Sequence, residues 1–220
     1  AYLRQSARDF GMSLEPEESV EMQALPDVLR PYQADGVRWM WKLSELKMGG
    51  ILADDMGLGK TIQTLTFIQA RGGRALVVCP SSLVFNWAAE AQKWFPDLKV
   101  ALHAGSKRGE LPQVDLVITS YAILRIDSEK FNAAEFDIAV LDEAQQIKNP
   151  DSKAAKAARA LESENRLVLT GTPIENRLLD VWSLMAYAMP GILGDRKYFR
   201  DSFDRRKDTL SQTRLTARLR

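Results

Sequence analysis

Two short segments of the sequence carry residues that are suited to phosphate and magnesium chemistry. The first, GLGKT at 57–61, follows an apolar run and opens a helical pattern. Its two glycines allow consecutive backbone N–H groups to face one point, at the positive end of the following helix. Lys60 can reach the β- and γ-phosphates of a nucleotide, and the Thr61 hydroxyl is placed to ligate Mg²⁺. We therefore predict a phosphate-binding loop made of Asp54, Asp55, Met56, Gly57, Leu58, Gly59, Lys60 and Thr61.

The second segment, IAVLDEAQ at 138–145, is an apolar strand pattern that ends in Asp142 and Glu143. The end of such a strand is where a P-loop enzyme holds its magnesium aspartate, which acts through the water shell of the metal. Glu143 is placed to orient and deprotonate an attacking water, which favours hydrolysis over phosphate transfer to a small acceptor. The two segments predict ATP and Mg²⁺ as cofactors. The predicted catalytic residues are Lys60, Asp142 and Glu143, and the predicted metal ligands are Thr61 and Asp142.

One position departs from the general phosphate-loop pattern GxxxxGK[ST], because Asp54 stands where that pattern has glycine. A turn without a ligand is therefore an alternative for the loop considered alone. The carboxylate pair at the end of a second strand argues strongly against that alternative.

The distribution of apolar residues predicts the strands and helices that position these residues. Near-continuous apolar runs alternate with helical patterns, which indicates a mostly parallel sheet with helices on both faces and an α/β fold. Polar residues follow the strand ends directly, where open sheets of this class bind ligands. The expected strands lie at 51–54, 75–79, 100–103, 115–119, 138–142 and 167–170.

Composition leaves the class of partner open. The chain has 30 basic and 29 acidic residues, so any nucleic-acid surface must be local. The single cysteine, Cys79, excludes an intramolecular disulfide, and its apolar setting predicts a buried thiol in a reducing compartment. Neither a membrane span nor the apolar core of a signal peptide is present in the sequence, so we expect a cytoplasmic protein without a membrane partner.

The chain divides into three parts by composition. Residues 1–27 are acidic and weakly patterned, as in a linker or the edge of an upstream region. Residues 28–190 contain all of the strands and motifs. Residues 191–220 form a basic helical extension, for which a solvated helix face and contact with a phosphate backbone are both open.

Six sequence blocks resemble the motifs of the Swi/Snf-type ATPases of helicase superfamily two, and they occur in the order of that family. In this family Asp54 is itself a common feature of motif I. The blocks are LRPYQADGVRWM at 29–40 (adenine-side motif), LADDMGLGKT at 52–61 (motif I), PSSLVFNW at 80–87 (motif Ia), ITSYAIL at 118–124 (motif Ib), LDEAQQIKN at 141–149 (motif II) and LTGTPIEN at 169–176 (motif III).

The resemblance implies a RecA-like P-loop lobe of a translocase that moves along double-stranded DNA without separating its strands. It places Arg30, Tyr32 and Gln33 against the adenine base. It also implies sequence-nonspecific contacts to the DNA backbone, which hydroxyls, amides and lysines can make. The implied DNA-binding residues are Ser81, Ser82, Asn86, Trp87, Thr119, Ser120, Tyr121 and Lys148, and the implied coupling residues are Gln145, Thr170, Gly171, Thr172 and Asn176.

Several of these residues also have a purely structural interpretation. Packing between helix and sheet is the alternative for Trp87 and Tyr121, and the hydroxyls near Thr170 could serve as helix caps. His103, the single histidine, is predicted to be structural. Gln145 replaces a histidine common in the family, as in many bacterial members. We therefore expect a bacterial or archaeal-like protein, associated with the nucleoid in a prokaryote or the nucleus in a eukaryote.

Members of this family have two such lobes, with ATP closed between them and an arginine finger supplied by the second. We therefore expect a second RecA-like lobe in the same parent chain, and DNA-bound protein complexes as further partners. Loss of an arginine finger costs about 10³ to 10⁵ in turnover, so this lobe alone is expected to hydrolyse ATP slowly or not at all. The alternatives are a strand-separating helicase, a metabolic P-loop kinase, and a nucleotide-responsive module that binds DNA or protein.

Overall fold

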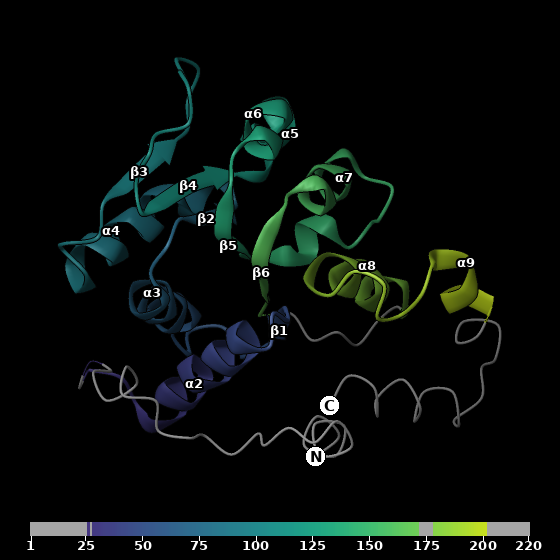
Figure 1. Cartoon of the computed structure of the whole chain (residues 1–220), viewed down its shortest axis with the longest axis horizontal. Helices are drawn as coiled ribbons and strands as arrows, with labels where there is room; N and C mark the ends of the chain where they lie inside the picture. The colour runs from purple at the N-terminus through teal and green to yellow at the C-terminus, as the bar shows by residue number, and fades with distance from the viewer. Residues whose placement is uncertain (1–25, 27, 172–177, 202–220) are drawn as a thin grey trace.

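The computed structural model describes residues 26, 28–171 and 178–201, and its centre is a six-stranded sheet (Figure 1). All neighbouring strands pair in parallel, in the order β1-β6-β5-β2-β4-β3. This confirms the predicted α/β fold and makes the sheet wholly parallel. The strands are β1 Gly50–Leu52, β2 Ala75–Cys79, β3 Val100–His103, β4 Leu116–Ser120, β5 Phe136–Leu141 and β6 Ser163–Leu169.

Helices cover both faces of the sheet (Figure 1). One face packs against α2 Pro31–Glu45, α3 Lys60–Arg71 and α4 Val84–Trp94. The other packs against α5 Tyr121–Ile126, α6 Ser128–Ala133, α7 Lys153–Ala160 and α8 Leu178–Ala188. The short 3-10 helices η2 Ser81–Leu83 and η3 Ala144–Ile147 follow β2 and β5, and α9 Arg196–Phe199 follows α8.

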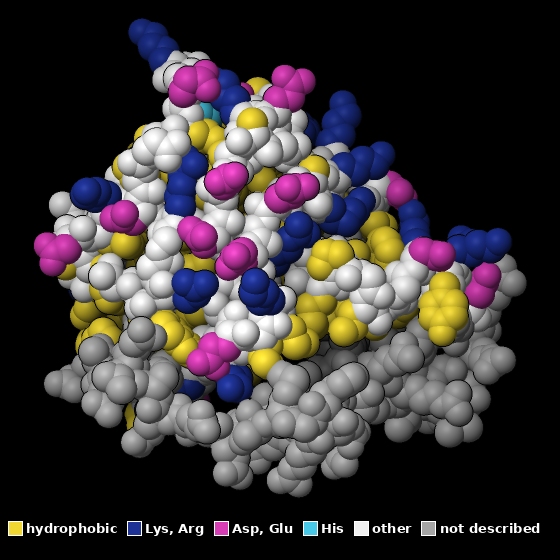
Figure 2. Space-filling model, in the orientation of Figure 1, with side chains coloured by type: hydrophobic (Ala, Val, Ile, Leu, Met, Phe, Trp, Pro, Cys, Tyr) yellow, Lys and Arg dark blue, Asp and Glu magenta, His cyan; other side chains and the backbone are white. Residues whose placement is uncertain are grey.

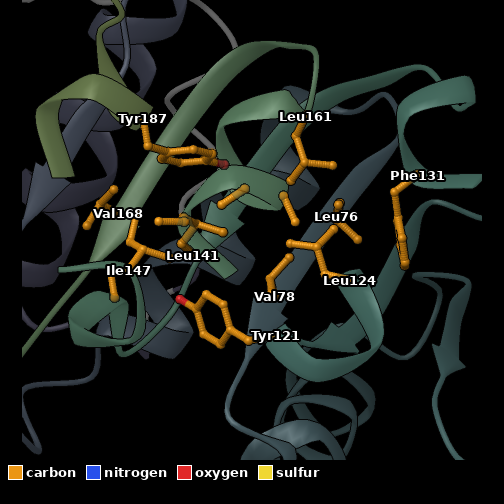
Figure 3. Packing of buried hydrophobic residues seen from close by; sticks show 14 of the residues in the cluster. Leu76, Val78, Tyr121, Leu124, Phe131, Leu141, Ile147, Leu161, Val168 and Tyr187 are labelled. Atoms are coloured by element: carbon orange, nitrogen blue, oxygen red, sulfur yellow. The ribbon is translucent and has the colours of Figure 1, made fainter. Parts of the chain in front are cut away.

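Strand β2 explains why the apolar runs are continuous rather than alternating. Leu76 and Val78 belong to the core cluster under α5 to α8, whereas Val77 and Cys79 belong to the cluster under α2 to α4. Successive side chains of a strand point to opposite faces, so a strand buried on both sides needs apolar residues at every position. Each fully buried aliphatic side chain contributes about 1.5 to 3 kcal/mol to this core. Figure 3 shows the first of the two clusters.

Helix starts follow local capping chemistry. Pro31 occupies the first turn of α2, where its missing N–H costs nothing. Ser120 caps α5 by accepting from the Ile123 N–H, and Ser152 caps α7 by accepting from the Ala155 N–H. The last strand differs most from the prediction, because β6 begins four residues earlier, whereas β1 ends two residues earlier and β5 begins two residues earlier.

His103 and Cys79 have structural roles, as expected. His103 Nε2 lies 2.7 Å from Asp127 Oδ2, and Arg108 Nε donates to the same oxygen at 2.7 Å. The hydrogen bond from Arg108, assisted by the one from His103, lowers the pKa of Asp127 to about 2 although partial burial opposes this. Burial, assisted by the charge of Asp142, raises the pKa of the Cys79 thiol to about 12, so the thiol is unreactive.

Some predictions fall outside the described residues. These are the acidic segment 1–27 apart from Pro26, most of the basic extension, and the motif III residues Thr172 and Asn176. Within the described part of the extension, α9 is helical as expected. Basic and acidic side chains are interspersed on the face shown in Figure 2, in keeping with a net charge of +1. No helix in the described ranges is both long and apolar enough to cross a membrane.

Candidate nucleotide-binding site

The predicted phosphate loop lies between β1 and α3 and is shaped by two left-handed glycines. Gly57 has φ +84° and Gly59 has φ +79°, a region that side chains other than glycine rarely adopt. Gly59 is the N-cap of α3, so the loop turns directly into the helix start, where the first N–H groups have no intrahelical acceptor. A side chain on Gly59 would place its Cβ 2.4 Å from Gln33 Nε2. The loop therefore leads directly into the positive end of α3, where free N–H groups can meet an anion.

Lys60 is anchored inside this loop. Its side chain is buried, and Nζ donates to the carbonyl oxygens of Asp54 at 2.7 Å and Asp55 at 3.1 Å. The ammonium therefore lies at the loop that it was predicted to serve. The departure at position 54 also has a local reason, because Asp54 Oδ2 accepts from Gln63 Nε2 at 3.3 Å. Gln63 of α3 thus holds the start of the loop through this hydrogen bond, a role that was not predicted from the sequence.

The adenine-side residues hold the loop from the side of α2. Gln33 Nε2 donates to the Leu58 carbonyl at 3.1 Å, and Tyr32 Oη donates to the same oxygen at 3.3 Å. The Gln33 Oε1 atom accepts from the Arg30 N–H at 2.9 Å. Both ends of the Gln33 amide are therefore held within the chain, while the second N–H of Nε2 and the second lone pair of Oε1 stay available for a base.

Asp142 follows β5 directly and is buried. Its Oδ2 accepts from the Trp87 indole N–H at 2.8 Å, and its Oδ1 accepts from the Glu143 N–H at 2.9 Å. Burial raises the pKa of Asp142 above its usual value, and the negative charge of Glu143 adds to the rise. The two N–H donors and the Lys60 charge act in the opposite direction. The carboxylate is thus held in one orientation at the end of the strand, where it was predicted.

Glu143 adopts a left-handed conformation with φ +48°, which is uncommon for a residue with a side chain. Such strain concentrates at functional sites. The Glu143 Oε2 atom accepts from Gln145 Nε2 at 2.8 Å. The remaining amide oxygen of Gln145 is buried and has no hydrogen-bond partner among the described residues. Gln145 therefore orients the Glu143 carboxylate directly through this hydrogen bond. The sequence did not predict this contact.

A cavity of about 470 Å³ joins these groups. Lys60, Thr61, Asp142 and Glu143 all line it, and it extends to Arg30 and Gln33. One wall is a stripe of α4, and Asn86, predicted to face DNA, belongs to this wall. Sequence reasoning missed Glu90 and Trp94 in the same stripe, although their spacing of three to four residues along a helix is the available signal. The stripe consists of Asn86, Trp87, Glu90 and Trp94, and Leu83, the N-cap of α4, lines the cavity next to it.

The predicted DNA-facing residues separate by exposure. Ser81, Ser82 and Asn86 are exposed, and Lys148 is half-buried. The side chains of Trp87, Thr119, Ser120 and Tyr121 are buried, so their predicted direct contact with DNA needs correction. Trp87 and Tyr121 pack in the two core clusters, which is the packing alternative stated above.

The two hydroxyls have local partners instead of surface positions. Thr119 Oγ1 donates to the His103 carbonyl at 2.8 Å, and Ser120 Oγ caps α5. Both hydroxyls are therefore used to join β4 to β3 and to start α5. Among the predicted DNA contacts, the accessible set is reduced to the η2 serines, Asn86 and Lys148.

The beginning of motif III lies against the phosphate loop. The Thr170 N–H donates to the Leu52 carbonyl at 3.1 Å, which joins the end of β6 to the end of β1. A Cβ added to Gly171 would lie 2.6 Å from Met56 Cγ and 3.5 Å from Lys60 Nζ. This contact brings two predicted coupling residues to the loop that they were expected to sense.

A wholly parallel sheet, a glycine loop at a helix start and a carboxylate pair at the end of β5, with β6 between β5 and β1, define a P-loop nucleotide-binding lobe. A family model for the SNF2-related domain matches residues 32–220. The chain belongs to this family, and its fold is that of a SWI2/SNF2 ATPase core lobe.

The chain is similar to proteins from several organisms. The chain is 38% identical over 91% of its length to the TATA-binding protein-associated factor MOT1 of Saccharomyces cerevisiae, of which it covers 12%. It is 39% identical over 81% of its length to the putative ATP-dependent helicase/translocase YwqA of Bacillus subtilis, of which it covers 21%. The Sulfolobus solfataricus SWI2/SNF2 ATPase core in complex with dsDNA matches 87% of the chain with TM-score 0.82 and 39% identity, and 42% of that structure is covered. The chain therefore spans only a small part of these curated relatives.

Proposed function

We propose that this chain is the ATP-binding lobe of a two-lobe translocase that uses ATP hydrolysis to move along double-stranded DNA. The observation that carries the proposal is the cavity in which the phosphate loop, Lys60, Thr61, Asp142 and Glu143 meet. A second lobe in the same parent protein would complete the site. Membership of the SNF2-related domain family and the likeness to a core structure with bound dsDNA support the same function. DNA-bound protein complexes and a location beside DNA, in a nucleoid or a nucleus, belong to this proposal.

The residues present fit a nucleotide and a hard divalent cation. Among the described residues, apart from the two chain neighbours of Gly57, no heavy atom lies within 4 Å of a Cβ placed on Gly57, so the loop is open on that side. The helix start of α3 supplies N–H donors and Lys60 supplies a positive charge for phosphate oxygens. A hydroxyl from Thr61 and a carboxylate from Asp142 are oxygen ligands of the kind that Mg²⁺ prefers. When bound, Mg²⁺ would neutralise charge on the phosphate oxygens.

Each residue has a role in the proposed reaction. Lys60 would hold the terminal phosphates, and Asp142 would hold the metal ion. Glu143 accepts a proton from the attacking water, and Gln145 keeps the Glu143 carboxylate turned toward that position through its 2.8 Å hydrogen bond. Gly171 brings motif III against the loop, so that loss of the terminal phosphate is sensed there. Arg30, Tyr32 and Gln33 form the base side of the cavity, as the resemblance implies.

Nucleotide titration tests the proposed nucleotide site. A fluorescent ATP analogue with Mg²⁺ should bind the wild-type chain, and Lys60→Ala should weaken binding about tenfold or more, because a charged hydrogen-bond donor to phosphate is lost. Lys42→Ala is the matched control, since Lys42 pairs with Glu45 on the surface of α2. Thermal unfolding of both variants verifies the fold. Equal affinity of wild type and Lys60→Ala would reduce the chain to a passive binding module.

Salt-dependent DNA binding tests the proposed partner. Duplex DNA should bind without sequence preference, and Lys148→Ala should lower the slope of log affinity against log salt by about 1, the value for one phosphate contact. Lys99→Ala is the control, because Lys99 precedes β3 at the opposite end of the sheet. A strand-displacement assay on the parent protein separates translocation on an intact duplex from unwinding.

A further inference from the structure

Two buried aromatic side chains from different helices donate hydrogen bonds to Asp142. The Trp87 indole N–H of α4 donates to Oδ2 at 2.8 Å, and the Tyr121 hydroxyl of α5 donates to the main-chain carbonyl at 2.8 Å. Trp87 is 1% exposed and Tyr121 is 6% exposed. The two helices lie on opposite faces of the sheet, so Asp142 receives one hydrogen bond from each face.

All four polar atoms of Asp142 are engaged in this arrangement. Its N–H donates to the Val78 carbonyl of β2 at 2.8 Å, and Oδ1 accepts from the Glu143 N–H at 2.9 Å. The Trp87 and Tyr121 donors occupy the other two atoms. A side chain held at both carboxylate oxygens and at both main-chain atoms cannot rotate freely. The position of the carboxylate is therefore set in advance rather than on ligand binding.

A comparison within the core shows what is particular about Tyr121. Tyr187 of α8 is also buried, and its hydroxyl donates to the Ala139 carbonyl of β5 at 3.0 Å. Both rings lie in the same apolar cluster (Figure 3). The two tyrosines thus make the same kind of hydrogen bond to the same strand and the residue that follows it. Only the Tyr121 bond ends on the residue that carries the metal-binding carboxylate.

We propose that Trp87 and Tyr121 are positioning residues that fix Asp142 for the metal ion, and that α4 and α5 are thereby part of the magnesium site. This inference rests on the proposed nucleotide function. It assigns to Trp87 and Tyr121 a role in place of direct DNA contact. The N–H of Trp87 acts on the carboxylate itself, and the hydroxyl of Tyr121 acts on the backbone that carries it.

Variants that remove one hydrogen-bond donor each test the inference through the magnesium dependence of nucleotide binding. The affinity for a fluorescent ATP analogue is measured with Mg²⁺ and with a chelator, for wild type, Trp87→Phe and Tyr121→Phe. Trp87→Phe should reduce the enhancement by Mg²⁺ about tenfold, because a hydrogen bond to a charged group is lost. Tyr121→Phe should reduce it about threefold, because the lost bond is to a neutral carbonyl. The enhancement is the ratio of the two affinities of the same variant, so any direct effect of Trp87→Phe on the cavity wall appears in both measurements and cancels in the ratio.

Matched controls separate positioning from general packing. Tyr187→Phe removes the equivalent hydroxyl from the same cluster, and Trp182→Phe removes an indole N–H that donates to the Gly194 carbonyl at 3.1 Å. Tyr121→Phe and Tyr187→Phe should lower the melting temperature to a similar extent. Both controls should keep the wild-type magnesium enhancement.

The outcomes distinguish this inference from the function on which it rests. A wild-type chain that binds no nucleotide would overturn the proposed function and the inference together. Wild-type magnesium enhancement in Trp87→Phe and Tyr121→Phe would overturn the inference alone. An equal loss of enhancement in Tyr187→Phe would also overturn it, because the effect would then belong to the core as a whole.

Discussion

Substitution of Gly59 by alanine should disrupt the phosphate loop by two separable effects. The first is backbone strain, since φ +79° costs about 1 to 2 kcal/mol for a residue with a Cβ. The second is the contact at 2.4 Å between the new Cβ and Gln33 Nε2. Relief of that contact displaces the Gln33 amide and breaks its 3.1 Å hydrogen bond to the Leu58 carbonyl, at about 1 kcal/mol. The sum is about 2 to 3 kcal/mol.

Other glycines of the chain provide matched controls for this prediction. Gly57 has φ +84°, and a Cβ added there would meet no atom within 4 Å, so Gly57→Ala should show the strain alone. Gly72 is equally open with φ +66°, but it ends α3 far from the loop. Gly72→Ala should therefore lower stability without changing nucleotide affinity.

Denaturant unfolding and nucleotide titration measure the two effects. Gly59→Ala should exceed Gly57→Ala by about 1 kcal/mol in the free energy of unfolding, corresponding to the lost Gln33 bond. The excess should disappear when both glycine variants are compared in a Gln33→Ala background, because the contact no longer exists. Equal costs at the two glycines in the wild-type background would refute the role assigned to Gln33.

Three further outcomes are expected. Asp127→Asn should destabilise the chain by about 1 to 2 kcal/mol near pH 7 in denaturant unfolding; because the pKa of Asp127 is lowered to about 2, this difference should be present above about pH 4 and shrink as the pH falls toward 2. Cys79, with a pKa of about 12, should react with iodoacetamide at pH 8 at least about 10³-fold more slowly in the native than in the denatured chain, and comparable rates would contradict its burial. Gly171→Ala should weaken nucleotide binding by displacing Met56, and a second substitution, Met56→Ala, should restore most of the affinity if that contact is the cause.

Much of the fold was predictable because strands buried on both faces have an unambiguous pattern. The predicted bounds of β2 and β3 agree with the structure, and Asp142 follows β5 as expected. The start of β6 was missed because Asn165 is polar, yet it is buried and accepts from Ser44 of α2 at 2.8 Å. A partner so far away in the sequence leaves no local signal.

The candidate site shows a similar limit. Residue types and spacing predicted Lys60, Asp142 and Glu143 at one edge of the sheet, and the cavity brings them together. The directions of the Trp87 and Tyr121 polar atoms were not predictable, because periodicity indicates which face a residue occupies but not which acceptor its polar atom meets. The hydrogen bond from the Gln145 amide to Glu143 was not predictable either. It depends on the left-handed backbone of Glu143, which residue types and spacing do not indicate.

The pairing of β1 has a consequence for synthesis of the chain. β1 pairs only with β6 within the described sheet, with Gly50 opposite Leu167 and Leu52 opposite Leu169. A long stretch of chain that includes four other strands is therefore made after β1 before its partner exists. Contacts so distant in sequence form late and slowly. The phosphate loop that follows β1 thus lacks the strand beside β1 until β6 has been made, and a nascent chain should acquire nucleotide affinity only once motif III has been translated.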